Sequence, residues 1–100
     1  MTDWRHVHGM LKGIAARRSA LDAEELTWLR RAVNLRIWRH LGMVDAADYM
    51  ERELGYAPHT ARERLRVASA LEELPAIEAA LARGELCFSA VREVSRVATA

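Results

Sequence analysis

This chain of 100 residues has almost no cysteine, since Cys87 is the only one. A single cysteine excludes an intrachain disulfide and a zinc site made of several cysteines. Such usage is typical of a reducing compartment, so we expect a cytoplasmic protein. No histidine or pair of basic residues stands near Cys87 in the sequence, and we therefore expect a small buried side chain rather than a nucleophile.

Long apolar runs, proline and glycine are also scarce. No stretch approaches the roughly 18 apolar residues of a membrane span, and the N-terminus lacks the apolar core of a signal peptide, so we expect no membrane partner. Two prolines and five glycines interrupt a chain that is 51% hydrophobic and 29% charged. Residues that favour helices dominate, and β-branched runs of strand length are missing. The sequence therefore predicts one compact all-α domain of about six helices over residues 1–100.

The net charge is only +1, but the charges are segregated along the chain. Residues 1–20 carry a net charge of +3, and residues 45–55 carry a net charge of −3. Nucleic-acid binding requires a local basic surface rather than a basic total. A candidate basic surface must therefore be identified from where the basic residues cluster, not from the total charge.

A pair of helices is expected within residues 1–42. The first would be capped by Thr2 or Asp3, and its apolar residues recur at helical spacing: Trp4, Val7, Leu11, Ile14 and Ala15. Asp22 stands three residues before Glu25, as in a capping box, and is expected to begin the second helix, which Gly42 would end. One apolar stripe of that helix consists of Leu26, Leu29, Val33, Ile37 and Leu41.

The second predicted helix carries another apolar stripe, made of Trp28, Ala32, Leu35 and Trp38. A helix that is apolar on two sides is buried on both, either inside its own domain or between two chains. Trp28, Leu35 and Trp38 are therefore candidate interface residues, and a homodimer is a candidate assembly. Stacking of the tryptophans on single-stranded bases is a weaker alternative, because no basic residues alternate with them.

Residues 43–74 have the spacing of a helix-turn-helix, whose second helix lies in the major groove of DNA. Asp45 would begin a short helix that turns its apolar residues, Leu54 among them, inward, and Gly55 would end it with a positive φ. Pro58 suits the first position of the next helix, which would run to about Leu74. Ala57, just before it, offers no side-chain cap.

If the apolar side of this second helix faces the core, its opposite side near the N-terminal end would meet bases and phosphates of double-stranded DNA. The candidate DNA-binding residues on that side are His59, Thr60, Arg62, Glu63 and Arg66. The alternative is an exposed helix face on which arginine and glutamate form only weak pairs with their neighbours.

Residues 75–100 predict two further short helices. Pro75 would begin the first and Gly84 would end it. The last would turn apolar residues inward: Phe88, Val91, Val94 and Ala98. No capping signal or polar tail follows before Ala100, so we expect the sequence to be cut from a longer protein.

The segment "LGYAPHTARERLRVASALEELPAIEAALARGELCFSAVREVSRVAT", Leu54 to Thr99, resembles the helical domain of unknown function that precedes HNH nuclease modules in many bacterial proteins. The shared features are a turn before a "TARERLRVA" helix, an "LP…ALARGEL" helix and an "S…VREV…VAT" end. The resemblance extends through "LDAEELTWLRRAVNLRIWRHLG" over most of the chain. The order of elements is also distantly similar to the DNA-binding core of ParB-type partition proteins.

This resemblance implies a bacterial, DNA-associated helical module. The residues that match the family pattern are Thr60, Arg62, Arg64 and Arg66. No HNH motif occurs in the sequence, so we expect no enzyme within these residues, and a nuclease would have to lie beyond Ala100.

We expect no catalytic, metal or cofactor site. The four histidines lack the spacing of a zinc motif, and the neighbouring acidic residues fit helix ends better than an acid–base pair. The sequence thus predicts a helix-turn-helix module that binds double-stranded DNA. The alternative is a helical interaction or dimerisation module without nucleic acid, which loses its support if a monomer buries both stripes of the helix after Asp22.

Overall fold

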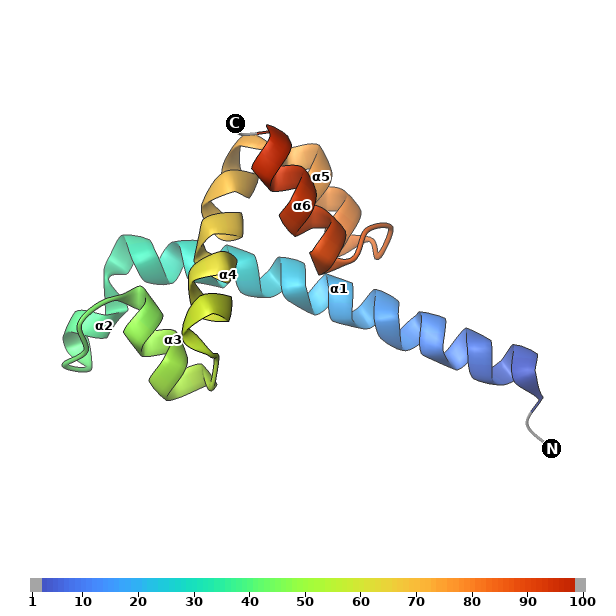
Figure 1. Ribbon diagram of the computed structural model, residues 1–100, viewed down its shortest axis with the longest axis horizontal. Coiled ribbons are helices and arrows are strands. Elements are labelled where there is room, and N and C mark those ends of the chain that lie inside the picture. The colour runs from blue at the N-terminus through green and yellow to red at the C-terminus, as the bar shows by residue number, and fades with distance from the viewer. Residues whose placement is uncertain (1–2, 99–100) are drawn as a thin grey trace.

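The computed structural model describes residues 3–98, which contain helices and no strand (Figure 1). The elements are α1 (Trp4–Leu35), α2 (Ile37–His40), α3 (Ala46–Leu54), α4 (Pro58–Ala70), the 3-10 turn η1 (Leu71–Glu73), α5 (Pro75–Ala82) and α6 (Phe88–Ala98). The prediction of an all-α fold is confirmed. No helix in the described part of the chain is both long and apolar enough to cross a membrane.

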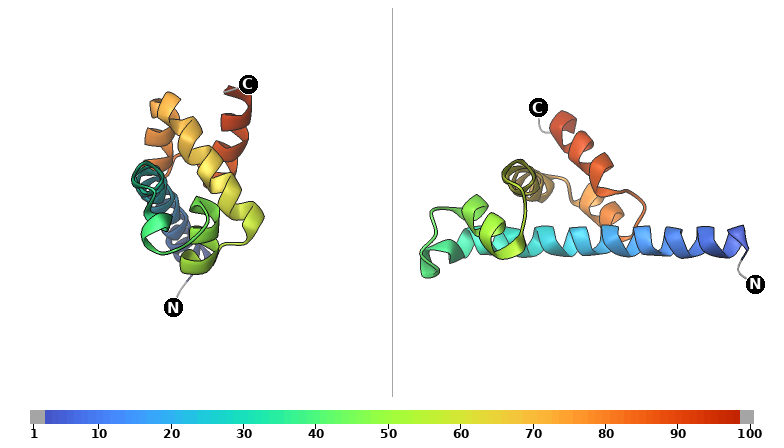
Figure 2. Two further views of the ribbon diagram at one scale, coloured as in Figure 1. Left: turned by 90° about the vertical axis from the view of Figure 1, so that its left-hand side faces the viewer. Right: turned by 60° about the horizontal axis from the view of Figure 1, so that its bottom comes forward.

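Helix α4 crosses the C-terminal half of α1, with α3 on one flank of the crossing and α5 and α6 on the other (Figures 1 and 2). The core lies where these helices meet. Its buried apolar residues are Ala23, Leu26, Leu29, Met50, Ala61, Val67, Ala68, Leu71, Leu81 and Val91. The N-terminal part of α1 extends beyond the other helices, so the molecule is elongated, with extents of 53 × 32 × 20 Å.

The helix boundary predicted at Asp22 is wrong, because α1 runs through it without a break. Asp22 lies inside α1 and accepts a hydrogen bond from Arg64 of α4 instead of capping a helix. The cap of α1 is Asp3, whose carboxylate accepts from the backbone N–H of His6 at 3.0 Å; the alternative cap, Thr2, lies outside the described residues. The alanine, leucine, arginine and glutamate residues around Asp22 all favour helix, so a local capping pattern does not interrupt it.

The helix also ends at Leu35 rather than at Gly42. Arg36 takes the left-handed conformation, with φ 50° and ψ 51°. A non-glycine residue in this conformation costs about 1–2 kcal/mol, so tertiary packing must favour it. That packing is the return of the chain through α2, which contacts α3.

The predicted bounds of α3 and the predicted start of α4 are confirmed, whereas α4 ends at Ala70 rather than near Leu74 and is followed by the 3-10 turn η1. Asp45 caps α3 by accepting from the backbone N–H of Asp48 at 2.8 Å, and Gly55 ends α3 with φ 76°. Pro58 stands in the first turn of α4, and Ala57 provides no side-chain cap. Helices α3 and α4 are thus joined by a turn of three residues, 55–57.

Candidate functional site

The predicted DNA-facing residues of α4 separate into two groups. His59, Thr60 and Arg62 are exposed near the start of the helix. Glu63 and Arg66 are only partly exposed, and both point to α6. The expected outer side of α4 is therefore only partly available to a ligand.

Glu63 and Arg66 belong to a network of charges between α4 and α6. Arg66 Nε donates to Glu63 Oε2 at 2.9 Å, and Arg96 Nη2 donates to Glu63 Oε1 at 2.6 Å. Arg66 also donates to Ser95 Oγ and to the carbonyl of Arg92, both at 3.2 Å. The hydrogen bonds from Arg66 and Arg96 lower the pKa of Glu63 to about 2. In this structure Arg66 holds α6 against α4 instead of facing outward as expected.

Arg64, one of the residues for which the resemblance implied a DNA-associated role, has a similar internal position. Its Nη1 atom donates to Asp22 and Glu25 of α1, and its guanidinium lies over the ring of Phe88. The hydroxyl of Tyr56 donates to the same Glu25 at 2.5 Å. Burial and this hydrogen bond raise the pKa of Tyr56 to about 12. Arg64 is therefore a joint between helices rather than a surface cation.

These internal pairs leave a weakly basic surface on the α3–α4 unit. Arg62 and His59 are the exposed basic side chains at the start of α4, whereas residues 45–55 have a net charge of −3. In a helix-turn-helix the first helix crosses the phosphate backbone, where negative side chains are repelled. The electrostatics of α3 thus oppose DNA contact more than the sequence pattern indicated.

A second candidate site is an apolar stripe along the whole of α1, which we call the α1 stripe. Its apolar residues are separated alternately by three and four positions: Trp4, Val7, Leu11, Ile14, Leu21, Trp28, Ala32 and Leu35. Arg18 and Glu25 occupy the two remaining positions of this spacing, which is that of a coiled-coil seam.

The α1 stripe lies away from the core. Trp4 is 69% exposed, Trp28 59% and Leu35 71%, whereas Ser19 and Leu26 of the same helix are buried against α4 and α5. The two stripes predicted for the second helix are thus not both buried: Trp28 and Leu35 are free, and Trp38 is half-buried. An interaction or dimerisation module requires an apolar stripe that the monomer leaves open, and the exposed Trp28 and Leu35 meet this requirement.

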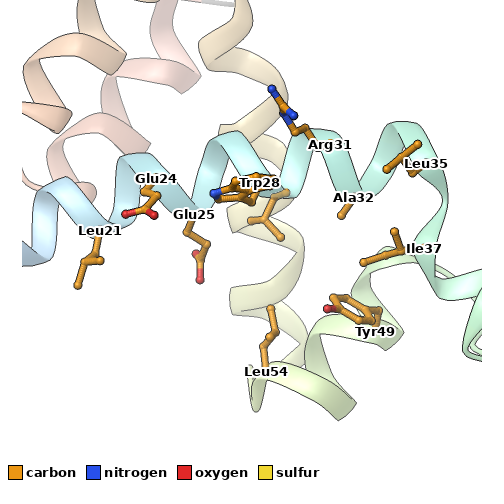
Figure 3. Close-up of a pocket in the computed structure, with 11 residues that line it drawn as sticks. Leu21, Glu24, Glu25, Trp28, Arg31, Ala32, Leu35, Ile37, Tyr49 and Leu54 are labelled. Carbon is orange, nitrogen blue, oxygen red and sulfur yellow. The ribbon is translucent and has the colours of Figure 1, made fainter.

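The C-terminal half of the α1 stripe forms one wall of a groove with a volume of about 640 Å³, which we call the α1 groove (Figure 3). Tyr49 and Leu54 of α3 lie across the opening from Trp28 and Ala32 of α1. The full lining is Leu21, Glu24, Glu25, Trp28, Leu29, Arg31, Ala32, Leu35, Ile37, Tyr49 and Leu54. It is a largely apolar surface with the carboxylates of Glu24 and Glu25 and the guanidinium of Arg31 as its charged groups.

Sequence reasoning missed the α1 groove for two reasons. The alternate spacing from Trp4 to Leu35 is present in the sequence, but a boundary at Asp22 divides it between two helices. Leu54 was expected to face inward from α3, and it is 46% exposed instead. Only the return of the chain after Arg36 brings α3 beside α1.

Cys87 and the histidines add no site. Cys87 is exposed, so the expectation of a buried side chain is wrong. It precedes α6, where its carbonyl accepts from Val91 N–H at 3.1 Å. No group of metal-ligating side chains occurs among residues 3–98.

Comparison of the chain with protein-family models, with curated proteins and with solved structures found no match. The likeness to the domain that precedes HNH nuclease modules and to ParB-type proteins therefore stays a prediction from the sequence.

Proposed function

We propose that this domain is a helical interaction module that binds an amphipathic helix of another polypeptide in the α1 groove. The observation that carries this proposal is the exposure of Trp28 and Leu35, which line the largely apolar α1 groove between α1 and α3. Large apolar surfaces left open on a small soluble domain commonly mark binding sites. Tryptophan in particular supplies much of the binding energy at protein interfaces.

The charges around the α1 groove indicate which charge its partner carries. The charged residues of its lining are Glu24, Glu25 and Arg31, of which Glu25 is already bound by Arg64 and Tyr56. The opposite wall, α3, belongs to the segment with a net charge of −3, so the surroundings of the groove are acidic on balance. A helix with an apolar stripe and basic flanks complements this surface, because opposite charges at the rim steer and orient association.

A synthetic peptide of that kind tests the proposal. We expect the fluorescence anisotropy of a labelled amphipathic helix, with leucine along one stripe and lysine beside it, to rise saturably with a Kd on the order of 10 μM. Trp28→Glu should abolish the rise, and Leu11→Glu, which lies outside the groove, should not. An otherwise identical peptide with glutamate flanks should bind more weakly.

Absence of saturable binding of the lysine peptide to both the natural chain and the Leu11→Glu variant would overturn the proposal. Equal binding by the Trp28→Glu variant would do the same, because the peptide would then lie elsewhere. Far-UV circular dichroism of each variant confirms that α1 is intact. Both substitutions fall on exposed side chains, so the core is unaffected.

DNA binding through the α3–α4 unit is the second candidate function. The exposed group of His59, Thr60 and Arg62 after the Gly55 turn favours it, as does the resemblance to the domain that precedes HNH nucleases. In that role the domain would be the targeting part of a larger bacterial nuclease. Because Arg64 and Arg66 are bound internally, the contact would depend mainly on Arg62.

A duplex-binding measurement tests this second function. Anisotropy of a labelled DNA duplex should rise with protein and weaken between about 50 and 200 mM salt, as phosphate contacts do. Arg62→Ala should weaken binding and reduce the salt slope by about one. Arg83→Ala, an exposed arginine at the end of α5, is the matched control and should leave binding unchanged. Binding that Arg62→Ala does not alter would remove this role from α4.

A further inference from the structure

We infer that the helix bound in the α1 groove is α1 of a second copy of this chain, in antiparallel orientation. This inference rests on the proposed function, since it names the partner of the same groove. In the pair, residues 4–14, the projecting part that we call the α1 arm, would lie in the groove of the other copy, and each arm would fill one groove.

The α1 arm matches the groove along its length. If Trp4 faces Leu35 of the second copy, the antiparallel register brings Val7 opposite Ala32 and Leu11 opposite Trp28 of that copy. Arm and groove lie at the two ends of the α1 stripe, on one unbroken helix. A two-fold axis near the middle of α1 therefore covers both ends at once, over a contact about 48 Å long for 32 residues.

The two polar residues of the α1 stripe select the antiparallel orientation. In a parallel pair, Arg18 would face Arg18 and Glu25 would face Glu25 in the centre of the seam, where like charges repel. In the antiparallel register Arg18 lies beside Leu21 of the second copy, and Glu25 lies beside Ile14. Glu25 is moreover already compensated within its own chain by Tyr56 and Arg64.

The flanks of the α1 stripe carry complementary charges in the same register. Arg17 and Glu24 both border the stripe and form no ion pair within residues 3–98. The antiparallel register places Arg17 of each copy near Glu24 of the other, so the pair forms twice. The α1 arm, whose charged residues are Arg5 and Lys12, would also lie along the wall that α3 forms, in the segment with a net charge of −3.

The apolar surface is large enough for a stable dimer. Trp4 and Trp28 are mostly exposed, and the four tryptophans of a pair would bury roughly 500 Å² if an aromatic side chain buries about 200 Å² in full. Stable interfaces bury about 1,200 Å² or more in total. The other residues of the two stripes and the walls formed by Tyr49 and Leu54 contribute the remainder.

Sedimentation equilibrium of the full chain gives the first test. We expect the mass of a dimer, and the mass of a monomer for Leu11→Glu and for Trp28→Glu, which alter the arm and the groove separately. Val97→Glu changes a side chain of α6 that is 80% exposed and lies off the stripe, and it should leave the dimer intact. A natural chain that stays monomeric at about 1 mM, or a dimer that survives Trp28→Glu, would overturn the inference.

Charge reversal tests the register. Arg17→Glu or Glu24→Arg alone should weaken the dimer at least tenfold, since each places two like charges at both symmetric contacts. The double variant Arg17→Glu, Glu24→Arg restores opposite charges at both contacts and should recover most of the affinity. If the single substitutions acted only by disturbing the fold of one chain, the double variant would not recover it. Failure of the double variant to recover affinity would contradict this pairing.

Cysteine crosslinking tests the orientation, in a Cys87→Ser background that removes the native thiol. A mixture of Val7→Cys and Ala32→Cys chains should form a mixed disulfide, because these positions face each other in the antiparallel register. A disulfide formed instead between two Val7→Cys chains, with none in the mixture, would indicate a parallel pair.

The outcomes separate the inference from the proposed function. A monomeric chain that still binds the lysine peptide in its groove would leave the interaction module standing and overturn self-pairing. A monomeric chain that binds no peptide would overturn both.

Discussion

The Nη1 atom of Arg64 on α4 lies 2.5 Å from the Oδ1 atom of Asp22 on α1. The same nitrogen is 3.1 Å from Glu25 Oε1, and the guanidinium carbon is 3.9 Å from the centroid of the Phe88 ring. Only 16% of the Arg64 side chain and 22% of the Asp22 side chain are exposed. One arginine thus connects α1, α4 and α6 in a largely water-excluded position.

Replacing this arginine should destabilise the fold. Arg64→Met keeps a long apolar side chain beside Phe88 but leaves Asp22 and Glu25 without their cation, so we expect the free energy of unfolding to fall by about 2 kcal/mol. Urea unfolding followed by circular dichroism measures it. Arg62→Met, an exposed change in the same helix, should alter stability by less than about 0.5 kcal/mol. Equal losses in the two variants would show that Arg64 is not the joint described above.

The carboxylate of Glu63 should contribute to acid stability. Its pKa is about 2 in the folded protein, against an ordinary value of 4.5, so the unfolded chain binds a proton more readily. The stabilisation is fully present above pH 4.5 and is lost as the pH falls from there towards about 2. In Glu63→Gln this part of the dependence of the melting temperature on pH should disappear. Glu72→Gln, an exposed carboxylate of η1, should retain it, and identical profiles for the two variants would contradict the prediction.

Gly84 should be needed both for its backbone conformation and for its lack of a side chain. It has φ 77°, and an added Cβ would lie 2.9 Å from the Cβ of Ala16 on α1. Gly42 has a similar φ of 71° but no neighbour within 4 Å of an added Cβ. Gly42→Ala should therefore cost about 1–2 kcal/mol for the left-handed backbone alone. Gly84→Ala should lower the unfolding free energy by more than that, and a smaller loss than at Gly42 would be inconsistent with the close approach to α1.

The two caps of the α3–α4 unit should respond in opposite directions. Asp45→Ala removes the hydrogen bond to the backbone N–H of Asp48 and should lower stability by about 1 kcal/mol. Ala57→Asp should raise stability by a similar amount, because the extended backbone at Ala57, with φ −67° and ψ 150°, suits a capping residue that is missing there. Thermal unfolding of both variants is the measurement, and a loss of stability in Ala57→Asp would show that the turn does not accept a cap.

Local signals predicted the start and the end of α3 and the start of α4. Asp45, Gly55 and Pro58 each stand where the sequence predicted. Asp22 failed as a signal because a carboxylate is tolerated inside a helix once an arginine from another helix binds it. Arg36 failed in the opposite way, since only the contacts of α2 with α3 favour its left-handed backbone.

The sequence by itself determined that this protein is helical, where α3 begins and ends, and that apolar residues recur at coiled-coil spacing from Trp4 to Leu35, because these properties depend on neighbours within a turn or two of helix. Tertiary structure alone decided which arginines of α4 are available to an external ligand. Arg64 and Arg66 are indistinguishable from Arg62 along the chain, yet their partners, Asp22 and Ser95, come from 42 and 29 residues away. The same long-range folding placed α3 beside the α1 stripe and so formed the α1 groove. The spacing of residues within one helix cannot specify which other helix lies beside it.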